Sequence, residues 1–110
     1  MTVHVSEAVR DEVSSIAQRY NTKPSRYGSA FLDEFQAALR AIEANPRLHS
    51  PAEDGRPGHE DRECYIERFQ QRVIFTIIGE NVYVLTVVHA TRRPGAWHRN
   101  LPIDPQPEST

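Results

Sequence analysis

The hydrophobic positions of this chain change their spacing once, from a helical period in the first half to nearly continuous apolar runs in the second. In two early stretches the apolar residues recur every three or four positions, which places them on one face of a helix. They are Val9, Val13, Ile16, Ala17 and Tyr20, and then Tyr27, Phe31, Phe35, Ala38, Leu39 and Ile42. The pattern predicts two consecutive amphipathic helices joined by a short link, which together form a helical hairpin.

Local signals predict where these helices begin and end. Before the first helix, Thr2–Val5 alternates between polar and apolar residues and predicts a short strand, and Ser6 is a residue type that caps helices. Pro24 stands where a proline can open the second helix. Asn45-Pro46 is expected to close it, because the residue before a proline is disfavoured in helical geometry.

The second half of the chain predicts three strands. Glu63–Phe69 alternates, while Arg72–Ile78 and Val82–His89 are nearly all apolar or β-branched. Gln70-Gln71 and Gly79–Asn81 are the expected turns between them. Continuous apolar strands indicate the centre of a sheet that is covered on at least part of both faces. The predicted fold class is therefore α+β: a small, mostly antiparallel sheet in the order β-α-α-β-β-β, with the helical hairpin on one face.

Composition supports one globular domain. The chain has 110 residues, of which 38% are apolar and 25% charged, and no window is apolar enough for a membrane helix. We expect one domain over residues 1–101, a disordered tail over 102–110, and a mobile loop over 47–61, where prolines, glycines and acids alternate. The N-terminus does not resemble a signal peptide, and the lone Cys64 suits a small core residue, so a cytoplasmic location is expected.

The candidate chemistry lies where the last two strands meet. His89 ends the final strand, where an imidazole could transfer protons, although it could equally cap the strand end through a backbone hydrogen bond. Across the Gly79–Asn81 turn, Arg72 is expected opposite position 88 and therefore near His89. Arg72 could hold a phosphate, or it could bridge to Glu67 or a backbone carbonyl.

A local basic segment follows that strand, although the net charge of the chain is −2. Positions 89–99 contain no acid and include Arg92, Arg93 and Arg99, which could bind an anionic target or form a solvated turn. Arg68 could join this patch. Trp97, the only tryptophan, could stack on a base or fold back as a lid on the sheet edge. The remaining histidines have no metal-ligand spacing, so neither a metal nor another cofactor is expected.

Three segments of the chain resemble the RelE/ParE superfamily of type II toxin–antitoxin toxins. Phe31–Pro46 is similar to the second helix of that family and its closing proline. Arg68–Phe75 is similar to a hairpin in which an arginine opens an apolar strand, and Val82–Pro94 to a final strand that ends in histidine and a basic turn. The resemblance covers roughly residues 3 to 99 and implies a small sheet holding two helices.

The resemblance implies a toxin that an antitoxin protein silences, but it leaves the target open. The ParE-like branch, which is slightly favoured, poisons DNA gyrase by binding. The other branch cuts messenger RNA on the ribosome without a metal, and there His89, Arg72 and Arg93 would be catalytic while Arg68, Arg92, Trp97 and Arg99 would bind substrate. Tryptophan stands where tyrosine is more usual, so Trp97 is expected to stack rather than to transfer protons. A third possibility is a non-toxic protein that only binds an antitoxin.

Overall fold

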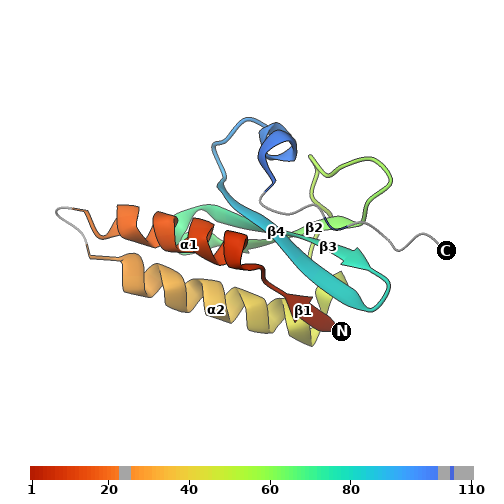
Figure 1. The fold of residues 1–110 in the computed structure, drawn as a ribbon, viewed down its shortest axis with the longest axis horizontal. Helices are drawn as coiled ribbons and strands as arrows, with labels where there is room; N and C mark the ends of the chain where they lie inside the picture. The colour runs from red at the N-terminus through yellow and green to blue at the C-terminus, as the bar shows by residue number, and fades with distance from the viewer. Residues whose placement is uncertain (23–25, 102–104, 106–110) are drawn as a thin grey trace.

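The computed structural model describes residues 1–22, 26–101 and 105, and it has the predicted α+β architecture (Figure 1). The first three elements are β1 (Thr2–His4), α1 (Glu7–Tyr20) and α2 (Gly28–Ala44). The strands β2 (Asp61–Ile66), β3 (Gln71–Ile78) and β4 (Asn81–His89) follow. In the sheet the strand order is β1-β4-β3-β2, with β1 parallel to β4 and the other pairs antiparallel.

The helix boundaries follow from capping and from one close contact. Ser6 caps α1, and its hydroxyl accepts a hydrogen bond from the Val9 backbone N–H at 3.1 Å. Between the helices, a Cβ on Gly28 would lie 2.5 Å from the Ala17 carbonyl oxygen, so only glycine permits this approach. The second helix ends at Ala44, directly before Asn45-Pro46, as predicted. Pro24, the predicted opening of that helix, lies outside the described residues.

All four predicted strands shift at a boundary; β2 begins at Asp61 rather than Glu63, and β4 at Asn81 rather than Val82. β1 ends at His4 rather than Val5, and the predicted strand Glu63–Phe69 is β2 followed by a 3-10 turn over Glu67–Phe69. Gln70 has a left-handed backbone with φ 52°, and Gln71 already belongs to β3. The alternation of Glu63–Phe69 was misleading because a 3-10 turn can also place every second or third apolar side chain inward.

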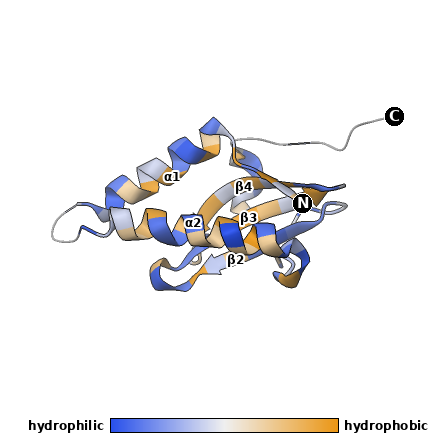
Figure 2. Cartoon of the chain, turned by 90° about the horizontal axis from the view of Figure 1, so that it is seen from below, coloured by the Kyte–Doolittle hydropathy of each residue, from blue (hydrophilic) through white to orange (hydrophobic). Residues whose placement is uncertain are grey.

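The sheet is covered on both faces, as the continuous apolar strands predicted. On one face, α1 and α2 bury the larger core against alternate residues of the strands, among them Val73, Phe75, Val82 and Val84. On the other face, Ile74, Leu85 and Val88 pack with Trp97 and Leu101. Figure 2, from the helix side, shows two amphipathic helices in front of hydrophobic stretches of β3 and β4.

The second face is covered by two irregular segments rather than by a helix. One is the connection between α2 and β2, which includes the 3-10 turn η1 (Pro46–Leu48), and the other is the 3-10 helix η3 (Ala96–Asn100) (Figure 1). The connection, predicted as a mobile loop over 47–61, is tied at several points. Ser50–Ala52 pairs with the start of β2, and ion pairs join Arg47 to Glu60 and Arg56 to Asp61.

Candidate functional site

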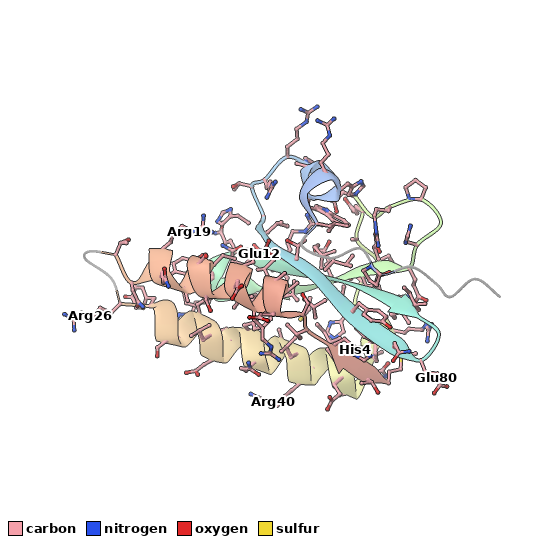
Figure 3. The ribbon with its side chains drawn as sticks, in the orientation of Figure 1. His4, Glu12, Arg19, Arg26, Arg40 and Glu80 are labelled. Carbon is pink, nitrogen blue, oxygen red and sulfur yellow. The ribbon has the colours of Figure 1, made fainter. Side chains whose placement is uncertain are left out.

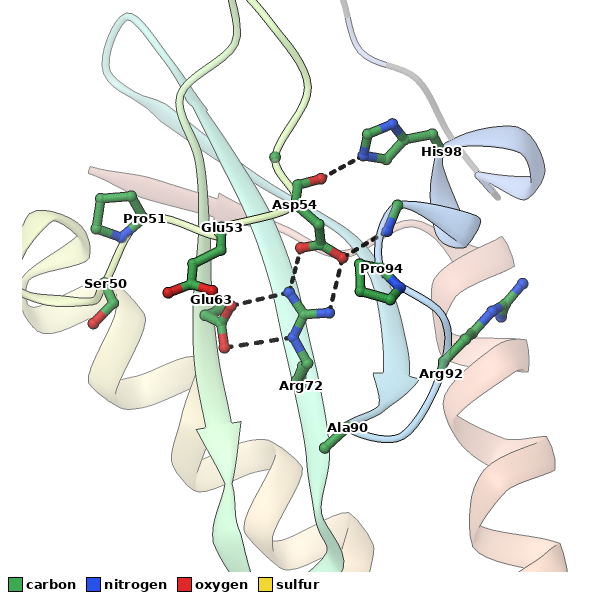
Figure 4. A pocket seen from close by; sticks show the side chains of 12 residues that line it. Ser50, Pro51, Glu53, Asp54, Glu63, Arg72, Ala90, Arg92, Pro94 and His98 are labelled. Carbon is green, nitrogen blue, oxygen red and sulfur yellow. Dashed lines mark hydrogen bonds and ion pairs between the residues drawn. The ribbon is translucent and has the colours of Figure 1, made fainter.

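The side chain of Asp54 joins the two irregular segments to the sheet. Its Oδ2 accepts hydrogen bonds from the indole Nε1 of Trp97 at 2.8 Å, the backbone N–H of Gly95 at 2.9 Å and Nη1 of Arg72 at 3.1 Å. Its Oδ1 accepts a further bond from Nη2 of Arg72 (Figure 4). One carboxylate therefore fixes the loop, the start of η3 and strand β3 in a single arrangement, which we call the Asp54 network.

Arg72 is neutralised within this network. Besides Asp54, its guanidinium donates to both carboxylate oxygens of Glu63 on the neighbouring strand, and its side chain is only 13% exposed. The hydrogen bond from Arg72 is the largest influence on Asp54 and holds the pKa of that carboxyl well below its usual range, against the opposing effect of burial. The same pairing raises the pKa of Arg72 above its ordinary value. This guanidinium is thus shared between two carboxylates rather than available to a phosphate.

A hollow of about 700 Å³ opens beside the Asp54 network (Figure 4). Its polar wall holds the carboxylates Glu53, Asp54 and Glu63 together with Arg72, Arg92 and His98. The His98 ring is anchored because its Nε2 hydrogen-bonds to the Asp54 carbonyl oxygen. Three carboxylates against two guanidiniums make this a poor site for a polyanion.

Trp97 is part of the core rather than of an open surface. Its side chain is 2% exposed and packs on Ile74, Leu85 and Val88. The expected alternatives were a stacking platform and a lid, and the structure places the indole as a lid over the sheet face, with its N–H on Asp54. In this conformation the ring offers no face to a base.

Strand pairing places Arg72 opposite Val88, as predicted from the turn, but it separates Arg72 from His89. Side chains alternate between the two faces of a strand, so Arg72 and Val88 share the face covered by Trp97. His89 pairs with Gln71 and lies on the helix face, where Gln71 Nε2 donates to the Tyr20 hydroxyl at 3.0 Å. The sequence predicted one site that contains both Arg72 and His89, but in the structure the two side chains lie on opposite faces of the sheet.

On the helix face, His89 lies between two shallow hollows of about 490 and 440 Å³. Its Nδ1 accepts from the Thr91 backbone N–H at 3.2 Å and contacts the Thr91 hydroxyl at 2.7 Å. The histidine thus caps the end of its strand, and a neutral ring with this bond carries its proton on Nε2. Tyr20 contributes to both hollows.

The other predicted arginines are exposed. Arg68 lies in the 3-10 turn, with its guanidinium carbon 5.5 Å from the ring centre of Tyr27. Arg92, Arg93 and Arg99 follow β4 in the turn and in η3. Within the described part of the chain, none of these four arginines forms an ion pair with a carboxylate. Among the described residues, no group of three or more His, Cys, Asp or Glu side chains is placed to hold a metal ion.

Several residues of these two sites were missed from sequence. Asp54 was expected only as an acid of the loop over 47–61, and Glu63 only as the first residue of a strand, yet an arginine in an apolar strand needs a carboxylate partner once it is covered. Arg19 reads as the polar side of α1, but it lines one of the two hollows beside His89. That position follows from the packing of α1 on β4, which residue spacing alone does not give.

Comparison with known proteins supports the fold. No family model matches the sequence, and a search of curated proteins finds no match. A solved chain of the "Chromosomal ParDE TA system from P. aeruginosa" superposes with a TM-score of 0.68 at 12% sequence identity, covering 81% of this chain and 95% of that one. At this identity the likeness establishes a shared fold. No helix among the described residues is long and apolar enough to cross a membrane.

Proposed function

We propose that this chain is the toxin component of a type II toxin–antitoxin pair. Two separate observations support the proposal. The sequence resembles the RelE/ParE superfamily in three ordered segments, and the fold matches a chain of a ParDE toxin–antitoxin system over 95% of that chain's length. The fold match carries the proposal, because it is independent of the local motifs.

We further propose that the toxin acts by binding its target, with DNA gyrase favoured over the ribosome. Cleavage of RNA without a metal would need a proton-transfer group beside an available phosphate-binding arginine. Here Arg72 is shared between Asp54 and Glu63, and His89 lies on the opposite face. Trp97, the expected stacking residue, is buried. These contacts favour a binding toxin over the catalytic arrangement that the sequence suggested.

Ribosome-dependent cleavage of messenger RNA remains the second candidate because His89 keeps an imidazole Nε2 near exposed arginines. In that case the catalytic residues would be His89 with Arg93, and Arg68, Arg92 or Arg99 would bind the RNA. A non-toxic antitoxin-binding protein is the third candidate. All three share the same partner.

Controlled expression in a bacterial host separates these candidates. The proposal predicts growth arrest and a DNA damage response with intact transcripts, and both effects are expected to persist in His89→Ala and Arg93→Ala. Cleaved transcripts that disappear in either variant would establish the ribonuclease instead. Normal growth with well-expressed, folded protein would favour the non-toxic candidate.

The antitoxin is expected to occupy the groove between α2 and β2. This groove measures about 590 Å³ and is lined by Glu34, Ala37, Ala38 and the segment 64–68. An extended or helical segment could bury apolar surface there while acidic residues reach Arg68. Cys64 lines the groove, so a bound antitoxin should slow alkylation of its thiol, whereas unchanged alkylation in a purified complex would place the antitoxin elsewhere.

A further inference from the structure

The arginines of this chain fall into two groups with different electrostatic roles. Arg47, Arg56, Arg62 and Arg72 each form an ion pair with a carboxylate of the α2–β2 connection or of β2. The other eight form none among the described residues, and all are exposed: Arg10, Arg19, Arg26, Arg40, Arg68, Arg92, Arg93 and Arg99. The positions of these unpaired arginines, rather than the net charge of −2, decide where the surface is basic.

Three of the unpaired arginines, Arg19, Arg68 and Arg92, surround His89. Arg19 and Arg92 line one of the hollows beside it, and Arg68 lines the other. Neither hollow is lined by an Asp or Glu side chain. We call the surface formed by Arg19, Arg68, Arg92 and Tyr27 around His89 the basic end.

The basic end lies where α1 meets α2, away from the acidic turn between β3 and β4. Figure 3 shows Arg19 and Arg26 at this end of the molecule, whereas Glu80 lies at the opposite end. Arg19 and Arg26 thus lie far from Glu80. Such a distribution orients an approaching polyanion toward the basic end even though the whole protein is slightly acidic.

An aromatic ring accompanies the arginines. Tyr27 is 51% exposed, and the Arg68 guanidinium lies 5.5 Å from its ring centre and 5.2 Å from that of Phe69. These contacts hold Arg68 without neutralising it, so its N–H groups stay available to an anion. Cationic groups beside an exposed aromatic ring are the usual components of a site for single-stranded nucleic acid, in which phosphates meet arginines and a base stacks on the ring.

We propose that the basic end binds a single DNA strand, with phosphates on Arg19, Arg68 and Arg92 and one base on Tyr27. The choice of a single strand follows from the side chains, whereas the choice of DNA over RNA rests on the proposed function. DNA is the substrate of the proposed target, so a toxin bound there would lie close to DNA. The basic end lies mainly on the helix face of the sheet, although Arg92 also lines the hollow beside the Asp54 network.

Fluorescence anisotropy with the purified full chain and a labelled 12-nucleotide DNA strand tests this proposal. Three phosphate contacts on a single strand give a salt slope of about −2, so raising the salt from 50 to 200 mM should weaken binding about 20-fold. Replacing Arg19, Arg68 or Arg92 by Gln should lower that factor to about 7-fold and weaken binding at 50 mM about 8-fold. Tyr27→Leu should weaken binding about 5- to 100-fold and leave the salt slope unchanged.

Arg40→Gln is the matched control. Arg40 is exposed on α2 and lies away from the basic end (Figure 3), so its loss changes the net charge equally. Equal weakening by Arg40→Gln and Arg68→Gln would overturn the proposal, because the attraction would then be non-specific. Competition by polyglutamate as strong as that by the unlabelled DNA strand would overturn it too, as would tighter binding of RNA or of duplex DNA of the same length. If the chain does not bind the DNA strand at 50 mM salt, the proposal is likewise overturned.

This assay contains no gyrase and no antitoxin, so its outcome is independent of growth inhibition. Loss of strand binding together with persistent DNA damage would remove the basic-end proposal and leave the proposed function standing. Strand binding without growth arrest would support the basic-end proposal and contradict the proposed function as a toxin.

Discussion

Replacing Asp54 by asparagine should destabilise the protein far more than an ordinary loop substitution. Oδ2 of Asp54 accepts from Trp97 Nε1, the Gly95 N–H and Arg72 Nη1. If the asparagine NH2 group took the Oδ2 position, it would face the N–H groups of Trp97, Gly95 and Arg72. If it took the Oδ1 position, it would face only Nη2 of Arg72. Hydrogen bonds to a charged group contribute about 1.5–3 kcal/mol each. The orientation that keeps an oxygen at the Oδ2 position loses only the bond from Arg72 Nη2, but the three remaining bonds then go to a neutral acceptor and are weaker. Because Arg72 keeps Glu63, we expect a loss of about 3 kcal/mol in the free energy of unfolding.

Urea unfolding followed by circular dichroism and by tryptophan fluorescence measures this loss. The chain has one tryptophan, so the fluorescence of Trp97 reports directly on the docking of η3 over the sheet. At about 4–8 °C per kcal/mol for a domain of this size, the melting temperature should fall by about 12–24 °C. Glu53→Gln, one position away, is the matched control, because Glu53 is exposed and should change stability by less than about 0.5 kcal/mol.

Acid should remove the same contribution in the unmodified protein. The folded-state pKa of Asp54 is lowered, mainly by the hydrogen bond from Arg72, so its stabilisation is present above the ordinary pKa and is lost as the pH falls. The stability difference between the native chain and Asp54→Asn should therefore be full at pH 6 and shrink below about pH 4. A loss under about 0.5 kcal/mol at pH 6, or a difference that does not change with acid, would refute the assigned role of Asp54.

Three smaller perturbations test other parts of the fold. Glu12→Ala should cost about 1–3 kcal/mol in urea unfolding, because it removes the Oε1 that accepts from the Val87 backbone N–H at 2.8 Å, and a loss near zero would contradict this role. Gly28→Ala should cost more than about 1 kcal/mol by the same assay, since its Cβ would meet the Ala17 carbonyl oxygen, and an unchanged midpoint would show that the helices separate freely. Burial raises the pKa of the Cys64 thiol, so at pH 8 maleimide should label the folded protein more slowly than the urea-unfolded protein; equal rates would refute that burial.

The sequence predicted the architecture well because the fold depends on signals that are local or periodic. The helical stripes, the Asn45-Pro46 stop and the Gly79–Asn81 turn fixed the elements and the pairing of β3 with β4. The turn position also predicted correctly that Arg72 lies opposite Val88 on the neighbouring strand. The error at Glu63–Phe69 arose because a 3-10 turn and a strand share short apolar alternation.

The site was harder to predict because its contacts are distant in sequence. The register that placed Arg72 opposite Val88 also placed Arg72 and His89 on opposite faces, which the strand period of two requires. From sequence, the expected partner of Arg72 was Glu67 or a backbone carbonyl, whereas the structure pairs it with Asp54 and Glu63. The contact with Asp54 depends on how the α2–β2 connection folds back over the sheet. The burial of Trp97 follows from the same docking.

The separation of paired from unpaired arginines could not be predicted either. Composition counts Arg47 and Arg19 alike, but one is bonded to Glu60 and the other lies free of any carboxylate among the described residues. Only the three-dimensional arrangement shows that three of the unpaired arginines gather around His89. A slightly acidic protein can therefore present a basic surface to its target.

The central claim, that this chain is a toxin that acts by binding DNA gyrase, is tested most directly by gyrase itself. Purified chain should inhibit supercoiling of a relaxed plasmid by purified gyrase, and the His89→Ala variant should inhibit it equally. Undiminished supercoiling at a large molar excess of folded toxin would contradict the claim.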